Sequence, residues 1–171
     1  MESSKPVHPV IAEDTGVGRL QVQIYTQGAS FHVDEPASAG GLASGPSPFD
    51  LMSASLGACT VMTIKFHAQR KAIQVTRVQV IVFHHRHPES GRDVFQRSIF
   101  IDGAIDEEQM RQLFAVADRC PVSKTLSAGA DIATTRNTAP ILTGRRVEDD
   151  EHVHAMEVAC EETPDAECLT A

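Results

Sequence analysis

Two cysteines, Cys59 and Cys120, lie in strongly patterned segments and are the residues of this sequence best suited to chemistry. Pro121 directly follows Cys120, and proline is favoured at the first position of a helix, so Cys120 is placed at the N-cap of a short helix. Backbone N–H groups and the positive end of the helix dipole stabilise a thiolate there. Arg119 and Lys124 add positive charge nearby. The sequence therefore predicts Cys120 as a reactive thiol.

Cys59 lies in the middle of an apolar segment, close to Leu56 and Met62. Apolar surroundings raise the pKa of a thiol, because burial disfavours its charged form. Cys59 is then either a structural cysteine that behaves as a small hydrophobic residue, or a nucleophile that needs a cation from elsewhere in the fold. The residues alone leave both interpretations open.

The remaining cysteines and histidines do not predict a metal site. No C-x-x-C motif is present, which excludes a thioredoxin-type motif and a zinc ribbon. His85 and His87 share one face of a predicted strand, but an exposed strand end before a turn explains them more simply. Cys160 and Cys168 lie in an acidic tail, in which residues 153–160 predict a short helix packed on the body of the protein.

The segment around Cys59 carries the clearest helix signal. Ser47 is suited to the N-cap, Pro48 to the first helical position and Asp50 to the third, a capping box with Asp in place of Glu. The helix is predicted to run from residue 48 to about residue 70. Residues 51–64 are small or apolar on nearly every side, which is typical of a buried helix. We therefore expect a long central helix that holds Cys59.

The other elements come in hairpins and short helices. Alternating apolar residues predict strands at 18–26, 29–35, 75–86, 94–103 and 130–136. Asp106 and Gln109 form a capping box that opens a helix at 107–119, and a short helix follows at 121–129. Paired strands favour an α+β fold with a mainly antiparallel sheet. Because one small sheet cannot cover the central helix, we expect a dimer in which two such helices share a core.

Composition sets further limits. The chain has 171 residues, 42% of them hydrophobic and 22% charged, as in a globular protein. Its net charge of −8 is concentrated in residues 148–171, which hold nine acidic residues and no Lys or Arg. We therefore predict a domain at 1–147 and an acidic tail at 148–171. The absence of a basic stripe argues against nucleic acid as a partner, and the lack of a long apolar run or secretory signal argues against a membrane and for the cytoplasm.

The segments GPSPFDLMSASLGACT and DEEQMRQLFAVADRCPVSKTL resemble the family of osmotically inducible protein C (OsmC) and organic hydroperoxide resistance (Ohr) proteins, in particular its OsmC-like branch. The resemblance covers about residues 16–136. It implies an OsmC-like fold and an intertwined homodimer. It also implies a cysteine-based reduction of organic hydroperoxides in oxidative-stress defence, with Cys59 as the peroxidatic and Cys120 as the resolving thiol. An external dithiol would reduce the disulfide, and no cofactor is implied.

The resemblance further implies that Arg19 activates Cys59 and that Phe49, Leu56 and Met62 line an apolar substrate pocket. The alternative interpretation of Arg19 is an ordinary surface arginine at the end of a strand. The sequence departs from the peroxidase members at Phe49, where those members have a Glu that holds the arginine. Asp50 faces away from Cys59, because nine residues turn a helix by about half a circle. A non-catalytic binding or redox-sensing protein is the alternative function.

That departure leaves the acid partner of the arginine open. Either an acid from elsewhere in the chain takes this role, with Asp34 and Glu35 at the end of the strand predicted at 29–35 as the candidates, or the arginine is not held by an acid.

Overall fold

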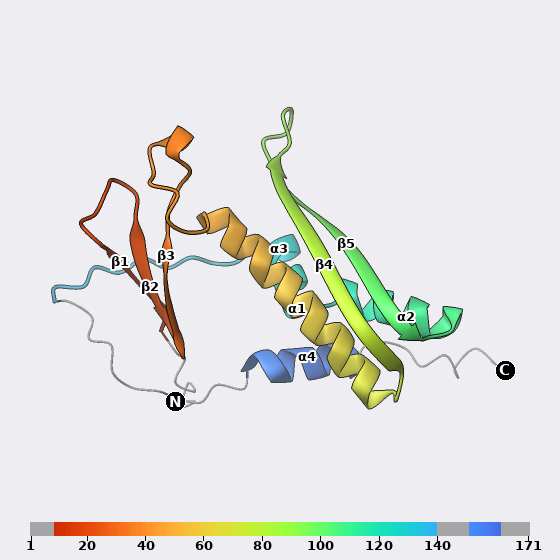
Figure 1. Ribbon diagram of the computed structural model, residues 1–171. Helices are drawn as coiled ribbons and strands as arrows, with labels where there is room; N and C mark the ends of the chain where they lie inside the picture. The colour runs from red at the N-terminus through yellow and green to blue at the C-terminus, as the bar shows by residue number, and fades with distance from the viewer. Residues whose placement is uncertain (1–8, 140–150, 162–171) are drawn as a thin grey trace. The chain divides into compact units, whose positions relative to one another are not determined.

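The computed structural model describes residues 9–139 and 151–161 (Figure 1). These residues form two compact units. The first runs to Leu51 and takes up the chain again from Asp131, and the second comprises Met52–Ala130 and the segment that begins at Glu151. Every strand pairing is antiparallel, so the α+β class with antiparallel sheets is confirmed.

The first unit contains a three-stranded sheet in the order β1 (Ile11–Asp14), β2 (Val22–Thr26) and β3 (Ala29–Val33). The predicted hairpin is the β2–β3 pair, in which Ile24 lies opposite Phe31. Its turn contains Gly28 with a φ of 82°, a left-handed conformation that glycine adopts without strain. After β3 the chain forms a 3₁₀ turn, η1 (Ala37–Ala39).

The loop after β3 is organised by the buried carboxylate of Asp34. This carboxylate accepts hydrogen bonds from the backbone N–H groups of Glu35, Leu42 and Ser44 at 2.9, 2.9 and 3.2 Å, and from the Ser44 hydroxyl at 2.8 Å. Burial acts to raise the pKa of Asp34, but these hydrogen bonds outweigh it and lower the pKa. Asp34 therefore fixes the loop that leads into the long helix.

Helix α1 (Pro48–Arg70) begins as the sequence predicts. The backbone N–H of Ser47 donates to the Asp50 carboxylate at 2.9 Å, and the backbone N–H of Asp50 donates to the Ser47 hydroxyl at 3.2 Å. One side of the helix is buried, at Leu56, Cys59, Thr60, Thr63, Ile64, His67 and Ala68. Met62, on the opposite side of the helix, and Met52, one turn before Leu56, are exposed in the single chain. The homodimer that the sequence predicts would have to cover these side chains.

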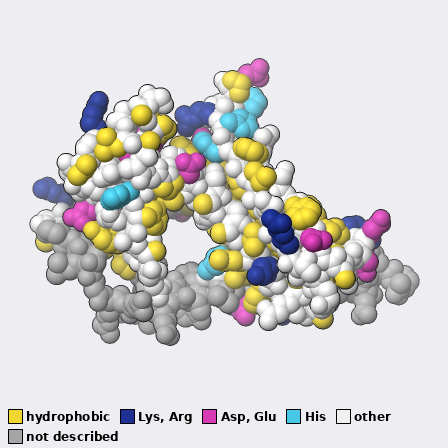
Figure 2. All heavy atoms as spheres, viewed as in Figure 1, with side chains coloured by type: hydrophobic (Ala, Val, Ile, Leu, Met, Phe, Trp, Pro, Cys, Tyr) yellow, Lys and Arg dark blue, Asp and Glu magenta, His cyan; other side chains and the backbone are white. Residues whose placement is uncertain are grey.

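In the second unit a long hairpin of β4 (Gln74–Arg86) and β5 (Asp93–Ala104) packs beside α1. Residues of α1, β5 and α2 (Glu107–Asp118), together with Ile73 just before β4, form the main core, which consists of Ile64, Ala68, Ile73, Ile101, Leu113 and Ala117. The hairpin also exposes large apolar side chains, and Figure 2 shows yellow side chains along it. The exposed ones are Ile81, Phe83 and Phe100.

The remaining helices are α3 (Pro121–Ala128) and α4 (Glu151–Glu161). The predicted capping box of Asp106 and Gln109 opens α2. Helix α4 is the short helix expected in the tail, and it packs against α3 with Met156 and Cys160 buried. No helix among the described residues is long and apolar enough to cross a membrane.

The strand expected at residues 130–136 is not formed. All of these residues are exposed, including Ile132 at 90%, and none pairs with a described strand. An alternating pattern is not sufficient for a strand, because each strand also needs a neighbouring edge to satisfy its backbone hydrogen bonds.

Candidate active site

The fold brings Cys59 and Cys120 together, although sixty-one positions separate them in the sequence. Cys59 comes from the middle of α1, and Cys120 from the residue that precedes α3. Their side chains are 2% and 0% exposed, and Leu56 completes their buried cluster. The two thiols are hydrogen-bonded to each other and are not linked as a disulfide. Two such thiols in contact are the arrangement needed for a reversible disulfide.

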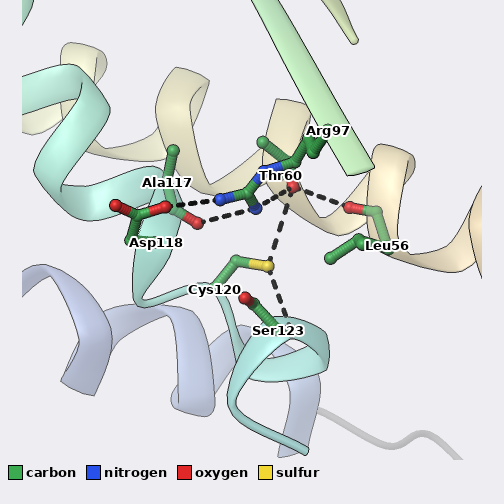
Figure 3. Close-up of polar contacts among 7 residues, drawn as sticks. All are labelled: Leu56, Thr60, Arg97, Ala117, Asp118, Cys120 and Ser123. Carbon is green, nitrogen blue, oxygen red and sulfur yellow. Dashed lines mark hydrogen bonds and ion pairs between the residues drawn. The ribbon is translucent and has the colours of Figure 1, made fainter. Parts of the chain in front are cut away.

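Cys120 is the N-cap of α3, as predicted from Pro121. Its sulfur accepts a hydrogen bond from the backbone N–H of Ser123 at 3.4 Å. The hydroxyl of Thr60, on α1, lies 3.8 Å from the same sulfur (Figure 3). The sulfur therefore lies between a helix N-terminus and a polar hydroxyl, two surroundings that favour a thiolate.

A cation that the sequence analysis missed, Arg97, lies behind this hydroxyl (Figure 3). From β5 its guanidinium donates to the Thr60 hydroxyl at 2.8 Å and to the Ala117 carbonyl at 3.1 Å, and it pairs with the Asp118 carboxylate at 2.6 Å. The Arg97 side chain is 12% exposed. The arginine thus ties β5 to α1 and to the end of α2, with its charge one hydroxyl away from Cys120.

The strand pattern held a signal for Arg97. Phe95, Ile99 and Ile101 alternate along β5 on the face that packs inward, and Arg97 falls in the same alternation. A charged residue in an inward-facing position is costly unless it is paired, so it marks a site with a defined partner. Sequence reasoning could have used this position, but could not have named the partner.

These contacts separate the pKa values of the two thiols. The hydrogen bond from the Cys59 thiol is the largest effect on Cys120, and burial opposes it. The Ser123 N–H, the Thr60 hydroxyl and the Arg97 charge act with that hydrogen bond and lower the pKa of Cys120 to about 6. The hydrogen bond with Cys120, followed by burial, raises the pKa of Cys59. When the pair has lost one of its two thiol protons, the negative charge therefore resides on Cys120 and the remaining proton on Cys59.

Cys59 has a further polar neighbour that the sequence analysis did not assign. Nε2 of His152, on α4, lies 3.5 Å from the Cys59 sulfur. No local pattern could have shown this, because ninety-three positions separate the two residues. The contact depends on α4 packing against the rest of the second unit.

The other predicted site residues lie in different surroundings. Leu56 is buried beside both cysteines, whereas Met62 faces an open groove that it shares with Met156. Phe49 and Arg19 belong to the first unit, in which Phe49 is 40% exposed and Arg19 is exposed. Asp34 is engaged by its own loop. The roles of Arg19, Phe49 and Met62 stay predictions.

An open cleft of about 480 Å³ adjoins the cysteine pair through Leu56 and Ser123. Its apolar lining includes Phe95 and Leu126, and its polar rim includes Arg92. Because polar and charged residues, among them Asp93, share the lining with the apolar ones, a small molecule with both apolar and polar parts fits this surface. Among the described residues, no group of three or more His, Cys, Asp or Glu side chains is placed to hold a metal ion.

Comparisons with known proteins agree with this architecture. Solved structures with the same fold include a Psychrobacter arcticus protein provisionally named as an osmotic stress induced and detoxification response protein (19% identity over 71% of this chain and 90% of that chain, TM-score 0.62). An OsmC-like protein of Mycoplasma pneumoniae (18%, 74% and 89%, TM-score 0.58) and the organic hydroperoxide resistance protein OhrB of Bacillus subtilis (21%, 70% and 89%, TM-score 0.51) are also similar. At these identities the likeness concerns the fold.

A comparison with curated proteins gives no matching sequence. The sequence model of the family described as OsmC-like protein matches residues 40–135, which include both Cys59 and Cys120. Because this match spans more than half of the chain, the chain belongs to the OsmC-like protein family.

Proposed function

We propose that this protein reduces organic hydroperoxides through Cys59 and Cys120. The observation that carries the proposal is the hydrogen-bonded pair of free thiols, one with a lowered pKa, at the edge of a partly apolar cleft. The family match and the similar fold of an organic hydroperoxide resistance protein from Bacillus subtilis support it. An organic hydroperoxide has an apolar body and a polar O–O group, which suits such a cleft.

The reaction follows from the two thiols. The Cys59 proton passes along the hydrogen bond to Cys120, and the Cys59 thiolate attacks the outer oxygen of the O–O bond. The alkoxide leaves and becomes an alcohol on taking up a proton, while Cys59 becomes a sulfenic acid. Cys120 then loses its proton and attacks the Cys59 sulfur, which releases water and forms the disulfide. The hydroperoxide gains two electrons, the thiol pair loses two, and an external dithiol restores the pair.

The surroundings of Cys120 suit the second of these steps. A resolving thiol must become a thiolate before it attacks the sulfenic acid, and the lowered pKa of Cys120, about 6, favours the loss of its proton at neutral pH. The Ser123 N–H and the Arg97–Thr60 contact supply this stabilisation. A dithiol reductant belongs to a reducing compartment, so the cytoplasm is the proposed location.

The proposal is tested by oxidising the reduced protein with one equivalent of cumene hydroperoxide. Peptide mass spectrometry should then find a Cys59–Cys120 disulfide. Cys120→Ser should consume about one equivalent and stop at a sulfenic acid on Cys59, which dimedone traps. Cys160→Ser is the matched control, because Cys160 is also a buried free thiol, and it should react as the unaltered protein does. Dimedone on Cys120 in the Cys59→Ser variant, with Cys59 unreactive in Cys120→Ser, would reverse the assigned order.

A redox sensor is the second candidate function. It is favoured by the burial of both sulfurs and by Phe49 at the position of the family Glu. The two candidates differ in turnover. With excess hydroperoxide and dithiothreitol, a peroxidase consumes many equivalents per chain, whereas a sensor is oxidised once and returns slowly.

We also propose a homodimer, as the family resemblance implies. The exposed apolar side chains Met62, Phe83 and Phe100 support it, because a single chain leaves them in water. Light scattering at micromolar concentration should give about twice the 18.5 kDa chain mass. A monomer that unfolds cooperatively would contradict this part of the proposal.

A further inference from the structure

Helix α4 brings an imidazole to the buried sulfur of Cys59. Nε2 of His152 lies 3.5 Å from that sulfur, within hydrogen-bonding range for a sulfur atom. The Cys59 side chain is 2% exposed, whereas His152 is an exposed residue. The imidazole thus connects the solvent with a thiol that is almost fully buried. Few side chains other than histidine can both give and take a proton near neutral pH.

The placement of His152 is built into the fold. Met156, Ala159 and Cys160 are buried and anchor one side of α4 on the rest of the second unit. Arg70, near the end of α1, lies 3.9 Å from the carboxylate of Glu161 at the other end of α4. Because both the apolar side and the far end of α4 are anchored on the unit that contains Cys59, the contact of His152 follows from the packing of the whole helix.

The contact also lies outside the part of the chain that matches the family. That match ends at residue 135, and α4 begins at Glu151. Arg97 acts on Cys120, and so stabilises the charge on the sulfur that is assigned to the second step. The Val122 N–H and the Thr63 hydroxyl also act to lower the pKa of Cys59, but neither group gives up a proton near neutral pH, whereas the imidazole of His152 is placed to do so.

We propose that His152 is a catalytic residue that stabilises the Cys59 thiolate once the proton has moved to Cys120, and that protonates the leaving alkoxide. This inference rests on the proposed function. The imidazolium donates its Nε2 proton to the Cys59 thiolate in a charge-assisted hydrogen bond, while Cys120 holds the proton that Cys59 has lost. When the Cys59 thiolate attacks the hydroperoxide, the O–O bond breaks and the alkoxide takes the Nε2 proton. Cys59 is left as a sulfenic acid and His152 as a neutral imidazole.

The test compares His152→Ala and His152→Gln with the control His154→Ala. His154 lies on the same helix, but its side chain is 73% exposed and pairs with Glu157 at 3.6 Å. The rate of Cys59 oxidation by cumene hydroperoxide should fall about 10- to 100-fold in His152→Ala, and His154→Ala should leave it unchanged. His152→Gln should fall between the two, because an amide donates a hydrogen bond but carries no proton to the alkoxide.

Two further readouts separate a chemical role from a structural one. Free imidazole should restore part of the rate in His152→Ala, in which it has room to bind, and should not affect His152→Gln. Alkylation of Cys59 by iodoacetamide, followed by peptide mass spectrometry, should slow in His152→Ala and recover with imidazole. This second readout needs no hydroperoxide chemistry.

The outcomes are distinguishable. If Cys59 of His152→Ala is oxidised and alkylated as fast as in the unaltered protein, and imidazole has no effect, the role of His152 is overturned. If His152 controls alkylation but cumene hydroperoxide oxidises neither cysteine, the proposed function fails and the contact still controls the Cys59 thiolate. His152→Gln keeps the test valid if His152→Ala loosens α4, because Gln is a good helix former.

Discussion

Replacing Arg97 tests whether its charge stabilises the Cys120 thiolate. In Arg97→Gln the side chain still offers a hydrogen bond to the Thr60 hydroxyl, but the positive charge is lost. The sulfur keeps the Ser123 N–H, so the local structure of the α3 N-terminus should persist. The pKa of Cys120 should therefore rise from its value of about 6, and Cys120 should be less ionised at neutral pH.

The size of the rise can be worked from the contacts. The guanidinium is 2.8 Å from the Thr60 oxygen, which is 3.8 Å from the Cys120 sulfur. At a separation of about 6–7 Å and an effective dielectric constant of about 20, the attraction is about 2.5 kcal/mol. The Asp118 carboxylate, 2.6 Å from the guanidinium, cancels part of this attraction. We therefore expect the pKa to rise by about one pH unit, since one unit corresponds to about 1.4 kcal/mol.

The assay is the rate of Cys120 alkylation by iodoacetamide as a function of pH, read by peptide mass spectrometry. The midpoint for Arg97→Gln should lie about one pH unit above that of the unaltered protein. Asp118→Asn is the matched control, because it removes the opposite charge. Its midpoint should move slightly in the other direction, since the Asp118 side chain is 81% exposed and water screens it. A midpoint in Arg97→Gln that is unchanged or lower would refute the role of the arginine.

Three further predictions concern stability. The pKa of Cys120 is about 6 in the folded protein and 9.0 ordinarily, so its ionisation adds stability as pH rises from 6 to 9.0, and that stability is lost as pH falls through 6. The free energy of unfolding of the reduced protein, measured by urea denaturation, should therefore exceed that of Cys120→Ser by a margin that grows over this pH range. A constant margin would contradict the lowered pKa of Cys120. Gly57→Ala should raise the free energy of unfolding by about 0.5–1 kcal/mol, because alanine favours a helix and its Cβ would lie 3.7 Å from Val82, an ordinary contact. Gly45→Ala should instead lower the free energy of unfolding by more than about 1 kcal/mol, because a Cβ there would lie 2.1 Å from the His32 carbonyl oxygen. Equal effects of the two glycine substitutions would show that these contacts do not govern stability.

The sequence by itself determined the local structure around the site. The capping boxes of Ser47 with Asp50 and of Asp106 with Gln109 were predictable, because each consists of hydrogen bonds between residues three positions apart. The N-cap position of Cys120 followed from the adjacent proline for the same reason. The alternation of apolar residues within β4 and β5 also predicted their hairpin. The same kind of pattern at residues 130–136 predicted a strand wrongly, because no described strand pairs with that segment.

Only the tertiary structure decided which thiol carries the charge and which side chains control it. Cys59 and Cys120 meet across sixty-one positions, Arg97 reaches Thr60 across thirty-seven, and His152 reaches Cys59 across ninety-three. No periodicity or capping rule links residues so far apart, because their contacts arise from the packing of helices and strands against one another. The pKa of a buried thiol depends on charges and hydrogen bonds within a few ångströms in space, and distance along the chain does not fix that neighbourhood.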